Sequence, residues 1–302
     1  MAKVKSKRIR RAWDDRIFDW ICGGFVCLLI FAVAYPLWFV VMASFSDPMY
    51  VNTGAFLIIP RGFNIDGYKM VFTDASIWRA YMNTIYYTVA GTLFGVAVTL
   101  LGGYALSRKD LIGRSPVMLL FTFTMYFSGG TIPLYLTIQS LGLLDTSAVM
   151  IILGSVTVYN IIVVRSFMVS NVPDDLFDAA KIDGCGNGRF FFQIVLPLSK
   201  AVIAIMVLYI AVHHWNSYFN AMMYLTDETK QPLQILLREI LVLSKSMATD
   251  PNMDAETAER MEQMSMVIKY AFIVISTAPI LCVYPFIQKY FVKGVMVGSV
   301  KG

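Results

Sequence analysis

The chain has 302 residues, of which 57% are hydrophobic and only 15% are charged, against about 25% charged residues in a typical soluble domain. Long, nearly uncharged runs recur, and about 20 apolar residues suffice to cross a bilayer. The composition excludes an ordinary soluble protein and predicts an all-α protein with several membrane spans, because unpaired strand edges cannot face lipid. We assign the net charge of +5 to the basic flanks of these spans, so no nucleic acid partner is expected.

The first apolar run covers residues 17–43 and follows a basic segment at residues 1–16. It is too long for a signal-peptide core and has no small-residue cleavage site after it, so we expect an uncleaved first span. Residues 44–78 are mixed in polarity and punctuated by proline and glycine, which predicts an external loop. A short helix around residues 65–72 is expected within this loop.

The next three spans are expected at residues 78–106, 115–141 and 148–169. The second span carries small residues at helical spacing, which permit close helix contact: Gly91, Gly95, Gly102 and Gly103. The third contains the run SGGTIP, and two glycines with a proline predict a break or kink inside a span. Between the second and third spans lies the basic segment SRKDLIGR, residues 107–114, which places that segment in the cytoplasm.

The fifth and sixth spans are expected at residues 200–225 and 265–287. A second external loop, residues 226–264, joins them and is long enough for a helix near residues 233–243. The tail after the sixth span is basic, as is the N-terminus, so both ends are predicted to be cytoplasmic. The expected protein is therefore a multi-pass membrane protein with six spans, and residues 17–302 form one transmembrane domain.

The longest of the expected cytoplasmic loops between two spans is residues 171–197, with the sequence NVPDDLFDAAKIDGCGNGRFFFQIVLP. A proline followed by Asp174 and Asp175 suits the first turn of a helix. Leu176, Ala179 and Ala180 then recur at helical spacing and predict one small apolar face. Glycines at 184, 186 and 188 end this helix before a second amphipathic piece. The result is a compact knob suited to a groove on another protein, although an ordinary interfacial loop held to the membrane by its phenylalanines is equally consistent.

This loop resembles the EAA motif of permease subunits of ABC importers. The family pattern is Glu-Ala-Ala, three residues, Gly, nine residues, Ile, one residue and Leu-Pro. The matching positions here are Asp178, Ala179, Ala180, Gly184, Ile194, Leu196 and Pro197. The likeness extends over nearly the whole chain. The segments TFTMYFSGGTIPLYLTIQSLGLLDT, HHWNSYFNAMMYL, PLQILLREI and NIDGYKMVF resemble the carbohydrate-uptake, maltose-type branch that handles complex oligosaccharides.

The resemblance implies a type I ABC importer permease fold in the bacterial cytoplasmic membrane. It also implies a second homologous permease subunit, two cytoplasmic ATP-binding subunits, an external solute-binding protein and an oligosaccharide substrate. The 171–197 loop would be a coupling element seated in a cleft of the ATPase, through Asp174, Asp175, Asp178, Ala179, Ala180, Asp183, Gly184, Ile194, Leu196 and Pro197. The chain has no GxxxxGK[ST] phosphate loop, so Mg-ATP would be bound by the partner, and this chain would be neither an enzyme nor a holder of a cofactor.

The position that departs from the family pattern is Asp178, where the family has glutamate. In the family this carboxylate contacts a basic residue of the ATPase. Because aspartate is one methylene shorter, we expect the contact to be tighter, water-mediated or shifted to Asp174 or Asp175.

Polar side chains in the expected spans are candidates for the substrate path, because they are costly in a bilayer unless they face a cavity or another helix. A stripe on the fifth span combines hydrogen-bonding and aromatic groups suited to sugars: His213, Asn216, Ser217, Asn220 and Tyr224. Further candidates are Tyr126 in the third span and Tyr159 and Asn160 in the fourth. Hydrogen bonding between helices, or plain packing, explains each of them equally well.

Other functions fit the sequence less well. An ABC permease for a non-sugar solute would share the loop motif. A stand-alone secondary transporter would bury carboxylates in its spans, where this chain has almost none. An intramembrane enzyme or a metal site would have to use His213 and His214, which are adjacent on a helix and so point in different directions. The four cysteines have no metal or redox spacing, so neither a disulfide framework nor a zinc site is expected.

Overall fold

The structure is a computed structural model that describes residues 13–52, 57–247, 263, 265–283 and 285, which contain helices and no strand. The chain divides into two compact units, residues 1–69 with 247–274 and residues 70–246 with 275–302. Most of the expected basic N-terminus, part of the second external loop and all of the basic tail lie outside the described residues.

The first unit contains the helix α1 (Trp13–Ser44), a short α2 (Pro48–Asn52) and the start of α3 (Asp66–Thr73). Apolar side chains at the end of α1 form a small core in which Ala43, Val51 and Leu57 are buried. The Ser44 hydroxyl lies 2.7 Å from the Tyr68 hydroxyl and so ties α1 to α3. These helices confirm the expected first apolar helix and the short helix around residues 65–72.

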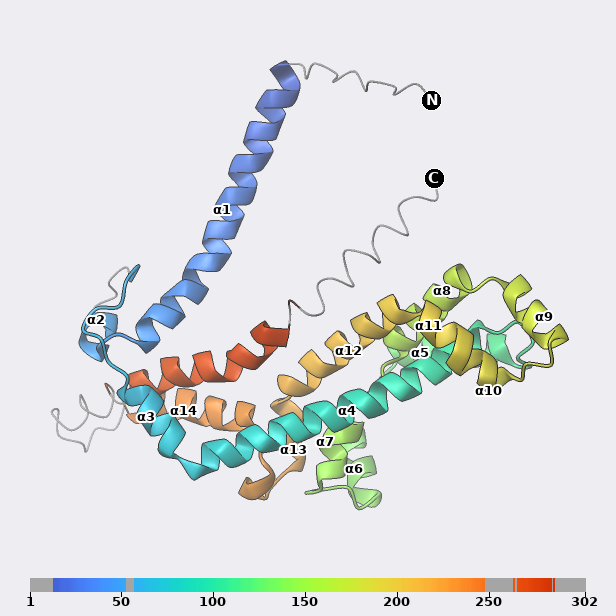
Figure 1. Ribbon diagram of the computed structural model, residues 1–302. Helices are drawn as coiled ribbons and strands as arrows, with labels where there is room; N and C mark the ends of the chain where they lie inside the picture. The colour runs from blue at the N-terminus through green and yellow to red at the C-terminus, as the bar shows by residue number, and fades with distance from the viewer. Residues whose placement is uncertain (1–12, 53–56, 248–262, 264, 284, 286–302) are drawn as a thin grey trace. The chain divides into compact units, whose positions relative to one another are not determined.

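The second unit is built along α4 (Ala75–Ser107), which begins where the Asp74 carboxylate accepts a hydrogen bond from the Ser76 amide at 2.8 Å. Three helices pack on it, namely α12 (Lys200–Trp215), α8 (Val158–Asn171) and α7 (Ser147–Ile152) (Figure 1). Its glycines allow this approach: a Cβ at Gly103 would lie 2.5 Å from Val164 Cγ1. The expectation of close helix contact at these small residues is confirmed.

The expected third span is broken as SGGTIP predicted. Helices α5 (Arg114–Tyr126) and α6 (Thr131–Ser140) meet at an angle of 116°. Gly130 has a φ of +86° at the break, a conformation that glycine adopts without steric cost.

The expectation of one continuous fourth span is wrong, because residues 153–157 separate α7 from α8. Gly154 has a φ of +79°, and the Thr157 hydroxyl accepts the Asn160 amide at 3.2 Å to cap α8.

The expected fifth span is also not continuous. Helix α12 ends at Trp215, and α13 (Phe219–Tyr224) starts after a turn at residues 216–218. The Val212 carbonyl accepts the Asn216 backbone amide at 3.1 Å and the Asn216 side-chain amide at 2.9 Å, so both amides of this residue close the last turn of α12. Beyond it, α14 (Leu233–Met247) confirms the helix expected near residues 233–243.

Within the part of the chain that the structure describes, three helices are long and apolar enough to cross a membrane: Trp13–Ser44, Ala75–Ser107 and Ser265–Val283. The described residues give up to five spans if two bent pairs count as one each, namely α5 with α6 and Asn187–Leu198 with α12, the latter bent by 83°. The chain is thus a helical protein with several apolar spans.

Candidate functional site

The 171–197 loop folds into two short helical pieces, as the sequence predicted (Figure 1). The first is α9 (Asp174–Ile182), which follows Pro173 and carries two aspartates in its first turn. Gly184 follows it with a φ of +73°, so the chain reverses at a residue without a side chain. The second piece runs through α10 (Asn187–Phe190), a π-helical turn (Phe191–Val195) and α11 (Leu196–Leu198).

One face of α9 is part of the protein core. Phe177 and Ala180 are buried together with Phe190 and Phe191 from the second piece, and the rings of Phe177 and Phe190 meet edge to face at 5.2 Å. The expectation that Ala180 shares an outward face with Leu176 and Ala179 is therefore wrong. Ala180 lies three residues from Phe177, on the same side of the helix, and both pack inward.

The opposite face of α9 is polar and exposed. Asp175, Asp178, Ala179 and Asp183 all lie on it, and the three carboxylates form no ion pair with any residue that the structure describes. This face is the one available to another protein.

Asp174 behaves differently from its neighbours, because Lys109 Nζ lies 2.6 Å from its Oδ2. The hydrogen bond from Lys109 holds the pKa of the Asp174 carboxyl below its usual value. The contact that the family's glutamate makes was expected to shift to Asp174 or Asp175. Asp174 already pairs with Lys109, so Asp175 is the one of the two that is available.

The second half of the motif anchors the loop. Ile194 and Leu196 are half-buried and pack against the core that contains Phe190, Phe191 and Val195, whereas Pro197 is exposed. These residues hold α9 on the rest of the unit, so the loop is a fixed projection from α8 and α12.

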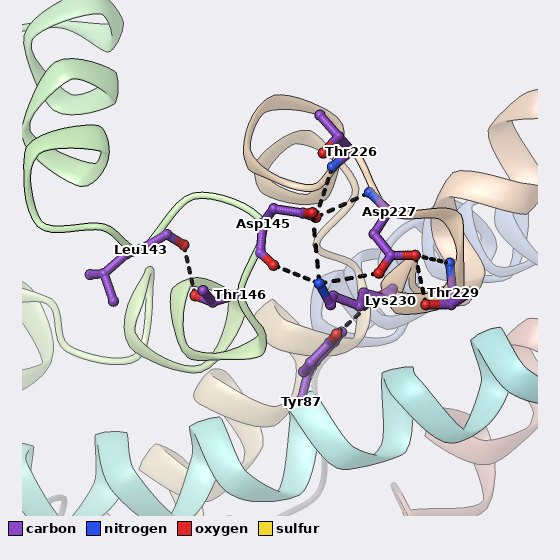
Figure 2. Close-up of polar contacts among 8 residues, drawn as sticks. All are labelled: Tyr87, Leu143, Asp145, Thr146, Thr226, Asp227, Thr229 and Lys230. Atoms are coloured by element: carbon purple, nitrogen blue, oxygen red, sulfur yellow. Dashed lines mark hydrogen bonds and ion pairs between the residues drawn. The ribbon is translucent and has the colours of Figure 1, made fainter.

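At the other end of α4, a polar cluster joins the turn before α7 to the segment after α13 (Figure 2). We call Asp145, Asp227 and Lys230 the clasp. Asp145 Oδ1 accepts the backbone amides of Thr226 and Asp227 at 3.1 and 3.0 Å. Lys230 Nζ lies between the two aspartates, 2.8 Å from the Asp145 carbonyl and 3.1 Å from Asp227 Oδ2.

The surroundings of each group in the clasp stabilise its charged form. The bonds from the side chain and amide of Thr229 lower the pKa of Asp227 to about 2, and the bond from the Asp227 amide lowers the pKa of Asp145. The hydrogen bond to Asp227 raises the pKa of Lys230. All three groups are therefore charged at neutral pH, and the Tyr87 hydroxyl ties the cluster to α4 by donating to the Lys230 carbonyl at 2.8 Å.

The expected substrate-path residues do not form one stripe, because the helix that was to carry them ends at Trp215. Four of these residues lie on separate segments and are exposed or half-buried, namely His213, Asn216, Ser217 and Asn220. Tyr224 is buried, and its ring stacks on that of Tyr135 at 5.9 Å. Tyr126 and Tyr159 are exposed, and Asn160 is buried.

A buried contact that the sequence did not reveal lies where α4, α12 and the break after α7 meet. His214 Nε2 is 2.9 Å from Ser155 Oγ, which also donates to the Gly91 carbonyl at 3.1 Å. A Cβ at Gly91 would collide with the His214 ring. His214 is thus a packing residue, and the described residues contain no group of three or more His, Cys, Asp and Glu side chains that could hold a metal ion.

Two charged pairs were also not predicted from the sequence. Asp145 and Lys230 are 85 positions apart, and Lys109 and Asp174 belong to different loops. No local spacing links such pairs. The signal that the sequence does offer is a charged residue in an otherwise uncharged turn, such as Asp145 in LGLLDTS.

Comparison with known proteins gives a consistent picture. Residues 112–297 match the family model described as "Binding-protein-dependent transport system inner membrane component". The chain is 42% identical over 288 residues, 95% of its length and 99% of the relative's, to the polygalacturonan/rhamnogalacturonan transport system permease protein YtcP of Bacillus subtilis. It is 26% identical, over 95% of its length and 98% of the relative's, to the arabinooligosaccharides transport system permease protein AraQ of Halalkalibacterium halodurans.

A solved structure has the same fold. A chain of a bacterial ABC transporter involved in the import of the acidic polysaccharide alginate matches with a TM-score of 0.81 and 32% identity. The match covers 94% of this chain and 99% of that one.

Proposed function

Because the chain belongs to the family of binding-protein-dependent transport system inner membrane components, we propose that it is one of two permease subunits of an ATP-driven importer of oligosaccharides. The observation that carries the proposal is the exposed acidic face of α9, held on the core by Phe177 and Ala180. A rigid projection of this kind transmits the closure of a partner to the helices that bear it. The chain is a transport subunit, and ATP hydrolysis belongs to that partner.

We assign the ends of α4 to the two sides of the membrane. Tyr87, beside the clasp, and Tyr104, beside the 171–197 loop, are 17 residues apart on one helix, which corresponds to about 26 Å, close to the thickness of a hydrocarbon core. In this arrangement the loop faces the cytoplasm and its ATPase, whereas the clasp faces the solute-binding protein. Six spans with both termini in the cytoplasm satisfy this arrangement, with α7 and α8 together forming the fourth.

The substrate class that we propose is an oligosaccharide of uronic acids. Both the relative that is 42% identical and the transporter that shares the fold are named for acidic polysaccharides, polygalacturonan or rhamnogalacturonan in one case and alginate in the other. His213, Asn216, Ser217, Asn220, Tyr126 and Tyr159 stay candidates for contacts along the path, since all are at least partly exposed.

The test is transport by the complete importer in proteoliposomes, with its second permease, ATPase and solute-binding protein. ATP-dependent uptake of labelled oligogalacturonides, with neutral oligosaccharides as the comparison, would support the substrate class. Asp178→Lys should lower copurification with the ATPase at least tenfold, because it places a cation on the acidic face, whereas Lys181→Ala should not. Normal copurification of the Asp178→Lys protein would contradict the coupling role.

A further inference from the structure

The turn at residues 107–114 lies beside α9 at the same end of α4 (Figure 1). It joins α4 to α5 and contains Arg108, Lys109 and Asp110 followed by an apolar tip. The proposed coupling role of the 171–197 loop makes no use of this turn.

Two contacts fix the turn to α9. Lys109 Nζ is 2.6 Å from Asp174 Oδ2, and the Arg108 guanidinium lies over the Phe177 ring, 3.1 Å from its centroid. Asp174 and Phe177 are one helical turn apart, so both contacts grip one side of α9. Arg108 is oriented in turn by Asp110, whose Oδ1 is 3.2 Å from its Nε.

The tip of the turn projects away from the protein. Ile112 is 98% exposed, and Gly113 has a φ of +81°, which reverses the chain directly after it. On α9, Ile182 is 87% exposed. Single exposed apolar residues are common, but these two sit on elements that are joined by the Lys109–Asp174 pair and the Arg108–Phe177 contact.

We infer that the 107–114 turn is a second contact for the ATPase subunit, with Ile112 as an apolar anchor beside the cleft that receives α9. The inference rests on the proposed function, because the turn contacts Asp174 and Phe177 of α9, the helix that is proposed to enter the ATPase. Burying an apolar side chain of this size strengthens binding, and a tenfold change in affinity corresponds to about 1.4 kcal/mol. The anchor should therefore change ATPase affinity by about tenfold or more.

The first experiment measures the affinity of the ATPase subunit for the complete permease pair in nanodiscs. Ile112→Ser should weaken binding about tenfold, whereas Ile112→Leu, which keeps an apolar group of the same size, should not. A matched control is Ile59→Ser, at an isoleucine that is also exposed but lies in the first unit. Unchanged affinity of the Ile112→Ser protein would overturn the inference.

A second experiment identifies what covers Ile112. A photoreactive amino acid at position 112 should crosslink to the ATPase subunit in the assembled importer. Adducts with lipid alone would overturn the inference and would show that the turn dips into the membrane surface. Failure here is separable from failure of the proposed function. If Asp178→Lys still lowers ATPase copurification at least tenfold, the coupling role of α9 stands and only the second contact is contradicted.

Discussion

The two ends of α4 differ in how their charged groups are used. At the clasp, Asp145, Asp227 and Lys230 form ion pairs and hydrogen bonds with one another and with nearby backbone groups, so each of these charged groups has a partner within the chain. At the 171–197 loop, Asp175 and Asp178 are exposed and form no ion pair with described residues. The difference indicates that one end is a structural joint, whereas the other leaves charged groups exposed on the surface.

The largest effect should come from disrupting the packing of α4 on α12, which lies between the two ends. Gly91→Leu places a side chain where the His214 ring lies, so α4 and α12 must separate. Overpacking of a core typically costs about 1–3 kcal/mol and occasionally more. We expect low yield and a lower melting temperature in detergent. A double variant, Gly91→Leu with His214→Ala, removes the ring that the leucine meets and should recover part of the loss, and no recovery would show that the collision is not the cause.

A smaller but local effect should follow from Ala180→Arg. Ala180 is buried against Phe177, so a charged side chain there has to leave the core and displace α9. We expect membrane insertion to be retained and copurification with the ATPase to be lost. Retained copurification would mean that α9 is not the coupling element.

At the other end, Asp145→Ala should act on stability and leave ATPase association unchanged. The variant removes the acceptor of two backbone amides at a residue whose φ is +55°. We expect the melting temperature to fall by about 3 °C. Asp145→Asn keeps an acceptor and tolerates the same backbone conformation, so it should lose less. Equal losses for both variants would argue against the acceptor role.

The smallest effect should be that of pH on the clasp. The pKa of Asp227 is lowered to about 2 and that of Asp145 is also lowered, so their contribution to stability is present above the pKa of an unfolded aspartate, near 4, and is lost as the pH falls toward 2. Thermal melting between pH 8 and pH 5 should give the same difference between the natural protein and Asp145→Asn. A difference that disappears by pH 5 would contradict the lowered pKa values.

The sequence was sufficient for features that depend on neighbours in the chain. The length of α4, the break at SGGTIP and the two pieces of the 171–197 loop follow from apolar runs, glycine and helix-start signals. The break at residues 153–157 was missed because IILGSVTVY reads as a continuous apolar run with a single glycine. The clasp could not be predicted for a different reason. Its residues meet only after α4, α7 and α13 have packed, so no short-range pattern encodes their pairing.

The 116° break between α5 and α6 has a consequence for biosynthesis. With 13 and 10 residues, these helices are about 20 and 15 Å long, and neither is long enough to cross a hydrocarbon core of about 30 Å. Neither segment can leave the translocon as an independent span. Because α5 packs on α8, which follows it in synthesis, we expect α5 to be retained in the membrane only once α8 has been made.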